Sequence, residues 1–357
     1  MTILWITLPI VFIFAYFARY ASPIVITHGY SQIMRPSKLL VFGAMLTLIL
    51  VAGLRSNIGD TFNYVNIYED NDFTWEYVLS KKDIGFGILQ MILKTISADP
   101  QIMIFTTALF TNLLIVIILA TYSKRIELSL YVYITGGLFL VSMNGIRQAL
   151  AGAIAFTATK YLIEGDFIKY SLIVVLASFI HQSALILLPI YFVVRFKPWS
   201  KATIALLILS IIIVMGFEKF SSILFSAIED TQYGRYDDFD EGGASSLRVV
   251  VMAAPLILAY LGRVKLKKLF PKSDVIVNMT LLSVVFMIVS TQSWIFARFS
   301  IYFGLYQLIL ISWVVDLFKQ RDQKMIYYCI LVCYLAYYYY ENVISLNIIY
   351  KSNFLTW

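Results

Sequence analysis

Apolar runs of nearly 20 residues recur from one end of this chain to the other, and runs of that length suit a lipid bilayer. Of its 357 residues 60% are hydrophobic and only 14% are charged, whereas a soluble domain carries about a quarter charged residues. In lipid only helices or a closed barrel satisfy the backbone, and these runs are too continuous for alternating barrel strands. The sequence therefore predicts an all-α polytopic membrane protein of about 10–12 transmembrane helices, forming a single membrane domain over residues 1–357.

Hydropathy predicts ten spans and leaves two segments ambiguous. The ambiguous segments are 84–97 and 171–194. The first span lacks a basic region before it and an Ala-x-Ala site after it, so we interpret it as a membrane helix and not as a cleaved signal. The ten predicted spans are 2–18, 39–54, 101–121, 128–143, 148–163, 202–217, 247–262, 275–294, 299–317 and 325–340.

Charge sets the expected orientation. The two longest loops, 55–83 and 218–246, are acidic and are predicted to be extracytoplasmic. Short basic loops mark the cytoplasmic side under the positive-inside rule, and they explain the net charge of +7 without a nucleic-acid partner. The basic loops carry Arg19, Arg35 and Lys38; Lys124 and Arg125; Arg195, Lys197 and Lys201; Arg263, Lys265, Lys267, Lys268 and Lys272; and Lys319, Arg321 and Lys324.

This orientation is consistent only if the two ambiguous segments behave unusually. Segment 84–97 is short, amphipathic and interrupted by glycines, which suits an interfacial or re-entrant helix. Segment 171–194 would enter the membrane and return, as two half-helices that meet at His181. One unbroken 24-residue helix with a different loop topology is the alternative.

Four strong polar residues lie at or inside span ends that this orientation places near one extracytoplasmic face. They are Arg55, Arg147, His181 and Arg298. Ionisable groups are expensive in lipid, so such a set favours a functional site. Three arginines and a histidine suit an anion, and phosphate is the obvious candidate.

The first two motifs surround Arg55 and Arg147. Arg55 and Asp60 follow the second span, and Gly59 would permit a tight turn between them; the alternative is an ion pair that only pins the loop. Arg147 and Gln148 open a helix rich in small residues, where free backbone N–H groups favour an anion. An arginine that merely snorkels to the interface is the alternative there.

The other two motifs surround His181 and Arg298. A neutral imidazole near pH 7 suits a general base, although a lone histidine in an apolar stretch is also a common packing residue. Arg298 opens a span, with Tyr302 one turn later, and Arg248 opens another span in the same way. Arg248 is a weaker candidate for the same anion site.

A fifth feature lies in the second acidic loop, where Tyr233, Arg235 and Tyr236 precede a run of carboxylates. Tyrosines beside carboxylates suit sugar binding, and a solvated loop is the alternative. Asp238 and Asp240 match a D-x-D metal motif, but such a match is close to chance in so acidic a loop, so we assign no metal. No phosphate-binding glycine loop, dinucleotide motif or serine-hydrolase motif occurs, and no cofactor is expected.

These motifs, in this order and between these spans, resemble the EpsG-like branch of the Wzy-type polysaccharide polymerases. The similarity covers roughly residues 10–320. It rests on R-x₃-G-D-x₃-Y (Arg55, Gly59, Asp60, Tyr64), N-x-x-R-Q (Arg147, Gln148), H-x-S-A-L-x-x-L-P (His181, Ser183, Pro189) and R-x₃-Y-F (Arg298, Tyr302, Phe303). The acidic residues Asp237 to Glu241 have no clear counterpart in it.

The resemblance implies a GT-C-like membrane glycosyltransferase that makes O-antigen, capsule or exopolysaccharide. It would join polyprenyl-diphosphate-linked oligosaccharides at the outer face of the bacterial cytoplasmic (inner) membrane, with membrane lipid and a chain-length regulator as candidate partners. Arg147, Arg298, Arg55 and Arg248 would bind the diphosphate, and His181 would be the general base, with Asp60 as the alternative base and Arg147 stabilising the transition state. The expected substrate contacts are Tyr64, Gln148, Gln182, Tyr233, Arg235, Tyr236 and Tyr302.

Other functions remain open at this point. A flippase or transporter of lipid-linked oligosaccharide would also need a cationic cavity, although its polar groups would be expected near the midplane between repeats. An O-antigen ligase uses the same donor with a different acceptor. A membrane acyltransferase would use a buried histidine but would not need several arginines.

Overall fold

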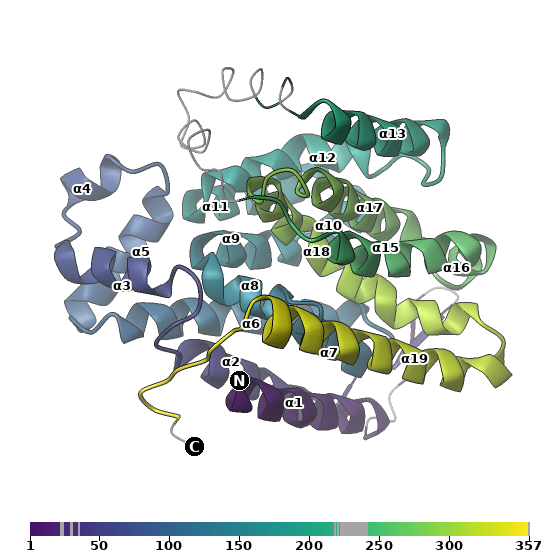
Figure 1. Ribbon diagram of the computed structural model, residues 1–357, viewed down its shortest axis with the longest axis horizontal. Coiled ribbons are helices and arrows are strands. Elements are labelled where there is room, and N and C mark those ends of the chain that lie inside the picture. Colours follow the sequence, from purple (N-terminus) through teal and green to yellow (C-terminus); the bar gives the residue numbers. More distant parts are fainter. Residues whose placement is uncertain are drawn as a thin grey trace.

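The computed structural model describes residues 1–21, 25–28, 31–34, 36–217, 219, 221 and 242–355, and these are helical nearly throughout (Figure 1). The elements are α1 (Thr2–Tyr20), β1 (Val25–His28), β2 (Ser31–Met34), α2 (Lys38–Gly53), α3 (Thr61–Asp70), α4 (Trp75–Leu79), α5 (Ile84–Ile96), α6 (Gln101–Tyr122), α7 (Ile126–Thr135), α8 (Leu138–Asn144), α9 (Ile146–Thr157), α10 (Thr159–Glu164), α11 (Phe167–Ile180), η1 (Gln182–Ile186), α12 (Leu187–Val193), α13 (Lys201–Met215), α15 (Ser246–Leu261), α16 (Arg263–Leu269), α17 (Ser273–Val289), α18 (Ile295–Val314), η3 (Val315–Leu317), α19 (Gln320–Tyr339) and the π-helix η4 (Tyr340–Ser345).

The helical, polytopic prediction is confirmed, although the spans are shorter than expected. By length and composition, α1, α6 and α18 with η3 can each cross a membrane, and five spans result if the bent pairs α7–α8 and α15–α16 each count as one. Six further apolar helices have only 10–17 residues. Helix breaks at Gly136, Ala158 and His181 interrupt apolar segments that hydropathy predicted to be continuous. A two-stranded hairpin, β1–β2, also joins α1 to α2 where no strand was predicted.

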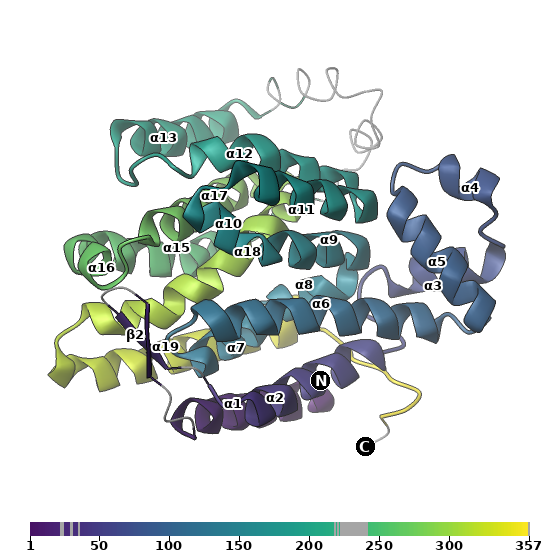
Figure 2. The same cartoon turned by 180° about the vertical axis from the view of Figure 1, so that it is seen from behind.

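The basic loops gather at one end of the helix bundle, here called the basic face. Arg19, at the end of α1, pairs with Glu127 at the start of α7. Arg125 donates two hydrogen bonds of 2.8 Å to Asp316 after α18. Lys265 Nζ donates to the carbonyl of Phe318 at 2.8 Å. Figure 2 shows the β-hairpin at this end together with α16.

The opposite end, here called the site face, carries Asp60, Asp83, Asn144, His181 and Arg298. Helices α3, α4 and α5 lie there in both views (Figures 1 and 2). The described residues include three to five candidate spans, so the polytopic architecture is confirmed and the number of about 10–12 spans stays a prediction.

Segment 171–194 enters the bundle and returns, as the charge argument required. His181 has extended backbone, with φ −154° and ψ 116°, and ends α11. The ring centroids of Phe167 and Tyr191 are 4.9 Å apart, and Tyr170 Oη donates to the carbonyl of Leu187 at 3.0 Å. The far ends of the two halves are thus side by side near the basic face, and the alternative of one unbroken helix is wrong.

Helix α5 stays at the site face and does not run to the basic face. It packs with α3 and α4 around a small apolar cluster that includes Tyr64, Tyr68 and Phe86. Lys94 Nζ donates to the carbonyl of Tyr68 at 2.5 Å, which ties the end of α5 to α3. The expectation that 84–97 does not span fully agrees with this placement.

Helix α18 forms the centre of the bundle and positions one of the arginines. Its 17 buried residues run from Ile295 to Val314. Phe303 stacks on Phe286 of α17 with ring centroids 5.3 Å apart. Arg298 lies in the first turn of this helix, so its position follows from the packed core.

Candidate functional site

Asp83, a residue that the sequence did not single out, is at the centre of the polar cluster. Its Oδ2 is 2.9 Å from Arg147 Nη1 and 2.9 Å from His181 Nδ1. Its Oδ1 accepts the backbone N–H of Gln182 at 3.0 Å. The carboxylate thus joins the start of α5, the start of α9 and the turn between α11 and η1. Sequence analysis placed Asp83 only in an acidic loop.

The surroundings of Asp83 favour its ionised form. Burial alone would raise the pKa of this carboxyl group, but the hydrogen bond with His181, the charges of His181 and Arg147, and the Gln182 N–H together hold the pKa below its usual value. A carboxylate beside Nδ1 selects the tautomer whose Nδ1–H donates to it. In that tautomer His181 Nε2 carries the lone pair and can accept a proton.

Arg147 lies at the N-terminus of α9, as predicted, and remains reachable. Its guanidinium carbon lies 5.8 Å from the ring centroid of Tyr64 and 6.0 Å from that of Phe86. The side chain is 41% exposed although one nitrogen bonds Asp83. Tyr64 itself is buried. Its buried ring packs beside the Arg147 guanidinium, which argues against the prediction that Tyr64 contacts the substrate directly.

A second set of contacts joins the remaining motifs. Gln148 Nε2 donates to the carbonyl of Arg298 at 2.9 Å and approaches Ser183 Oγ at 3.5 Å. Ser183 Oγ and Tyr302 Oη share a hydrogen bond of 2.7 Å. Gln148 and Tyr302 are buried and hold helices together, whereas Gln182 is exposed at the turn.

Asp60 connects the first motif to Arg298. Arg298 Nη2 is 3.8 Å from Asp60 Oδ2, and its guanidinium lies 4.4 Å from the Trp294 ring centroid. The backbone N–H of Asp60 donates to Asn144 Oδ1 at 2.8 Å. Gly59 has φ +51°, and a Cβ there would lie 2.1 Å from the same Asn144 oxygen. The predicted turn at Gly59 is therefore present, and it requires glycine.

Arg55 does not belong with the reachable arginines. It is 1% exposed, and its guanidinium donates to the carbonyls of Ala52 and Met143 and to Thr61 Oγ1. Burial lowers its pKa to about 10. Since protein oxygens enclose this guanidinium, Arg55 holds the loop to α8, and the expectation that it binds the diphosphate is corrected.

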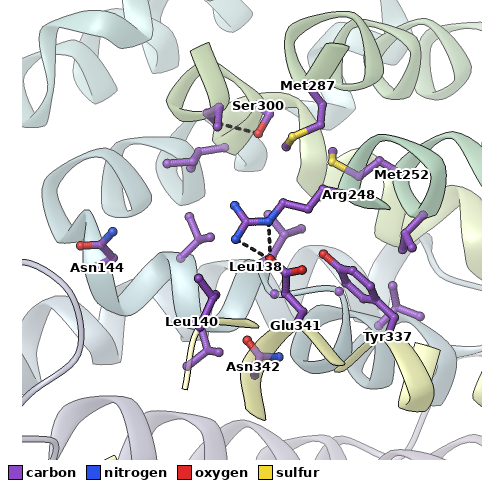
Figure 3. A pocket seen from close by; sticks show the side chains of 18 of the residues that line it. Leu138, Leu140, Asn144, Arg248, Met252, Met287, Ser300, Tyr337, Glu341 and Asn342 are labelled. Atoms are coloured by element: carbon purple, nitrogen blue, oxygen red, sulfur yellow. Dashed lines mark hydrogen bonds and ion pairs between the residues drawn. The ribbon is translucent and has the colours of Figure 1, made fainter. Parts of the chain in front are cut away.

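A cavity of about 360 Å³ opens among α7, α8, α15, α18 and α19, next to the polar cluster. Gly59, Asn144 and Ala297 line it, so it reaches the neighbourhood of Asp60 and Arg298. Arg248 also lines it, but both Nε and Nη2 lie 2.5 Å from Glu341 Oε1 (Figure 3). Because Glu341 neutralises it, Arg248 is a poor candidate for the diphosphate contact that the sequence suggested.

The last predicted contacts cannot be placed. Tyr233, Arg235 and Tyr236, like Asp237 to Glu241, lie outside the described residues.

Comparison with known proteins gives one match. The model of the EpsG family matches residues 38–354, which is most of the chain. No curated protein and no solved structure matches. The matched range includes all four motifs and both sides of the cavity.

Proposed function

The chain belongs to the EpsG family, and on that premise we propose that it is a membrane glycosyltransferase that polymerises oligosaccharide repeat units carried on a polyprenyl diphosphate. Membership in the family indicates a polymerase-related role in polysaccharide biosynthesis. The lipid carrier, the residues and the reaction described below are our proposal.

The observation that carries this proposal is the meeting of the four motifs at one face. Arg147 and Arg298 belong to different helices, and Gln148, the neighbour of Arg147, bonds the carbonyl of Arg298. Both guanidinium groups are partly exposed, at 41% and 32%. Two partly exposed arginines at the same face, on helices that this hydrogen bond joins, suit the phosphates of a diphosphate leaving group.

The proposed reaction transfers the nascent chain to an incoming unit. The hydroxyl oxygen of the acceptor sugar attacks C1 of the donor sugar, and the bond between C1 and the diphosphate oxygen breaks. The leaving polyprenyl diphosphate keeps the electron pair of that bond, and Arg147 and Arg298 stabilise the added charge. The hydroxyl proton passes to Nε2 of His181, while Asp83 holds the ring in the required tautomer.

Asp60 is the alternative base, because its carboxylate is 39% exposed beside Arg298. Its contact with Arg298 is the longest of the site's ion pairs, at 3.8 Å, so a ligand phosphate can replace it. His181 is the preferred base because its hydrogen bond to Asp83 leaves a defined acceptor nitrogen.

The proposed site would face outward. The basic loops occupy the opposite end of the bundle, and the positive-inside rule assigns that end to the cytoplasm. Donor and acceptor would then both be lipid-linked units in the outer leaflet of the cytoplasmic membrane.

Complementation of a strain that lacks the gene tests the proposal. Wild type, Arg147→Ala, His181→Ala and the control Arg263→Ala, an arginine on the basic face, are compared at matched membrane levels. We expect a polysaccharide ladder from wild type and the control, and a rate lower by about 10²–10³ in Arg147→Ala. Single capped repeats without a ladder in the null strain support a polymerase.

If single repeats never reach the outer face in the null strain, a transporter replaces the polymerase. If polymer chains form in the null strain but are not attached to their acceptor, a ligase replaces the polymerase.

A further inference from the structure

Within the described part of the chain, only one of the two carboxylate oxygens of buried Glu341 accepts a hydrogen bond. Both nitrogens of Arg248 that contact it approach the same oxygen, Oε1, at 2.5 Å. The other oxygen, Oε2, is buried and has no hydrogen-bond partner among the described residues. The residue is only 4% exposed and lines the cavity beside α18 (Figure 3). A buried carboxylate oxygen without a donor is costly, so a ligand in the cavity that donates a hydrogen bond to it would be stabilised.

The local backbone directs Glu341 into the cavity. α19 ends at Tyr339, and a π-helical turn begins at the next residue. Tyr337, Glu341 and Asn342, from α19 and this turn, all line the cavity. π-helical turns are rare and are often found at functional sites.

The chemistry of the cavity selects the kind of ligand. The charge of Arg248 is offset by Glu341, and a second negative group beside that carboxylate would be repelled, so a diphosphate does not fit here. An isoprenoid chain does not fit either, because it has no donor for Oε2. A hydroxyl group does donate to a carboxylate, and the apolar side chains of Leu138, Met252 and Met287 suit the C–H faces of a sugar ring.

Size and position agree with a sugar. A volume of about 360 Å³ is at the small end of ligand pockets, which span about 300–1,000 Å³. Asn144 lines the cavity and also accepts from the backbone of Asp60, which faces Arg298. A sugar in the cavity would therefore lie close to Asp60 and, across it, to Arg298, one of the arginines proposed to hold the donor diphosphate.

We propose that this cavity is the acceptor-sugar subsite, in which Glu341 Oε2 accepts a hydrogen bond from a hydroxyl of the bound sugar and Arg248 fixes the carboxylate. Its role as the acceptor subsite rests on the proposed polymerase function. The binding of an uncharged sugar at Glu341 does not, and can be measured separately.

The test is saturation-transfer NMR on the full chain in lipid nanodiscs. The probes are the methyl glycosides of glucose, galactose, mannose, N-acetylglucosamine and N-acetylgalactosamine. The main variant is Arg248→Met/Glu341→Leu, because removal of a whole buried ion pair is often neutral for stability whereas removal of one partner is not. The matched control is Arg19→Met/Glu127→Leu, which removes an arginine–glutamate pair of similar burial at the basic face.

We expect at least one glycoside to bind wild type and the control, and binding to be weaker by about tenfold or more in the main variant. Val251→Phe fills the cavity and leaves the ion pair intact, so it should also abolish glycoside binding. It takes the place of the main variant if that variant does not fold. The proposal is overturned if no glycoside binds wild type, or if binding survives in a folded variant of either kind.

The ladder assay separates this inference from the proposed function. If wild type makes no ladder but glycoside binding depends on Glu341, the polymerase fails and the sugar site stands. If wild type makes a ladder but glycoside binding does not depend on Glu341, the subsite fails and the polymerase stands.

Discussion

Asp83→Asn is the substitution that tests the site most directly, since it preserves the shape of the side chain and removes its charge. Asp83 accepts from His181, Arg147 and the backbone of Gln182. An asparagine oxygen can still accept from Gln182, but its NH₂ group then faces His181 Nδ1 and Arg147. The imidazole would accept at Nδ1 and carry its proton on Nε2, so Nε2 could no longer act as a base.

Two magnitudes follow from this geometry. Loss of the correct tautomer should lower the polymerisation rate by about 10³–10⁴, by analogy with the same exchange in serine-protease triads. Loss of the buried carboxylate should lower the free energy of unfolding by roughly 2–4 kcal/mol, less than a fully buried pair would give because Arg147 is 41% exposed.

The assay is ladder formation from purified lipid-linked repeat units by the protein in proteoliposomes, with thermal unfolding of each variant measured in parallel. Asp274→Asn is the control, because its exposed ion pair with Lys267 should contribute at most about 1 kcal/mol. The reasoning is refuted if Asp83→Asn retains a rate within tenfold of wild type while His181→Ala abolishes the ladder.

Three further predictions concern stability. Because the pKa of Asp83 is lowered in the folded protein, the stability that its carboxylate contributes is fully present above the unfolded pKa of about 4 and is lost as the pH falls through the folded pKa. Thermal unfolding should therefore show that wild type loses stability below about pH 4 relative to Asp83→Asn. Gly59→Ala should lower the free energy of unfolding by about 2 kcal/mol and weaken the ladder, because φ is +51° and the new Cβ would displace Asn144; a melting temperature equal to that of wild type would contradict this. Arg55→Met should lower it by roughly 2–5 kcal/mol, about 1–3 kcal/mol for each buried carbonyl that loses its donor, since Ala52 and Met143 both do; urea unfolding that shows a smaller loss than Arg147→Met would show that Arg55 is not structural.

The sequence was sufficient for the features that depend on local pattern and on charge. Polar residues in the middle of an apolar stretch, together with basic loops that had to share one face, predicted the break at His181 and the return of the chain. A helix N-terminus close to Arg147 and the turn at Gly59 were also predicted, because both have local signatures; α9 begins at Ile146 and Gly59 has a positive φ.

The partners of the site residues were not predictable in this way. Asp83 lies 64 residues from Arg147 and 98 from His181, and Glu341 lies 93 residues from Arg248. No spacing or periodicity connects such pairs, and only the packing of the helices brings them together. Arg55 shows the same limit: its place at a span end is like that of Arg147, but which carbonyls close around a guanidinium depends on the fold.

The way in which the hairpin of α11, η1 and α12 is held has a consequence for the motion of His181. The chain just after α12 is tied to α10, because Arg195 Nη1 donates to the carbonyl of Leu162 at 3.1 Å, and the start of α11 packs on α12 through Phe167 and Tyr191. The tip of the hairpin, which holds His181, is restrained by Asp83 on one side and, through Ser183, by Tyr302 of α18 on another. Opening of the Asp83 contacts would release the His181 imidazole and the Gln182 backbone amide together. Hydrogen exchange at the Gln182 amide would therefore report whether Asp83 holds His181 in place.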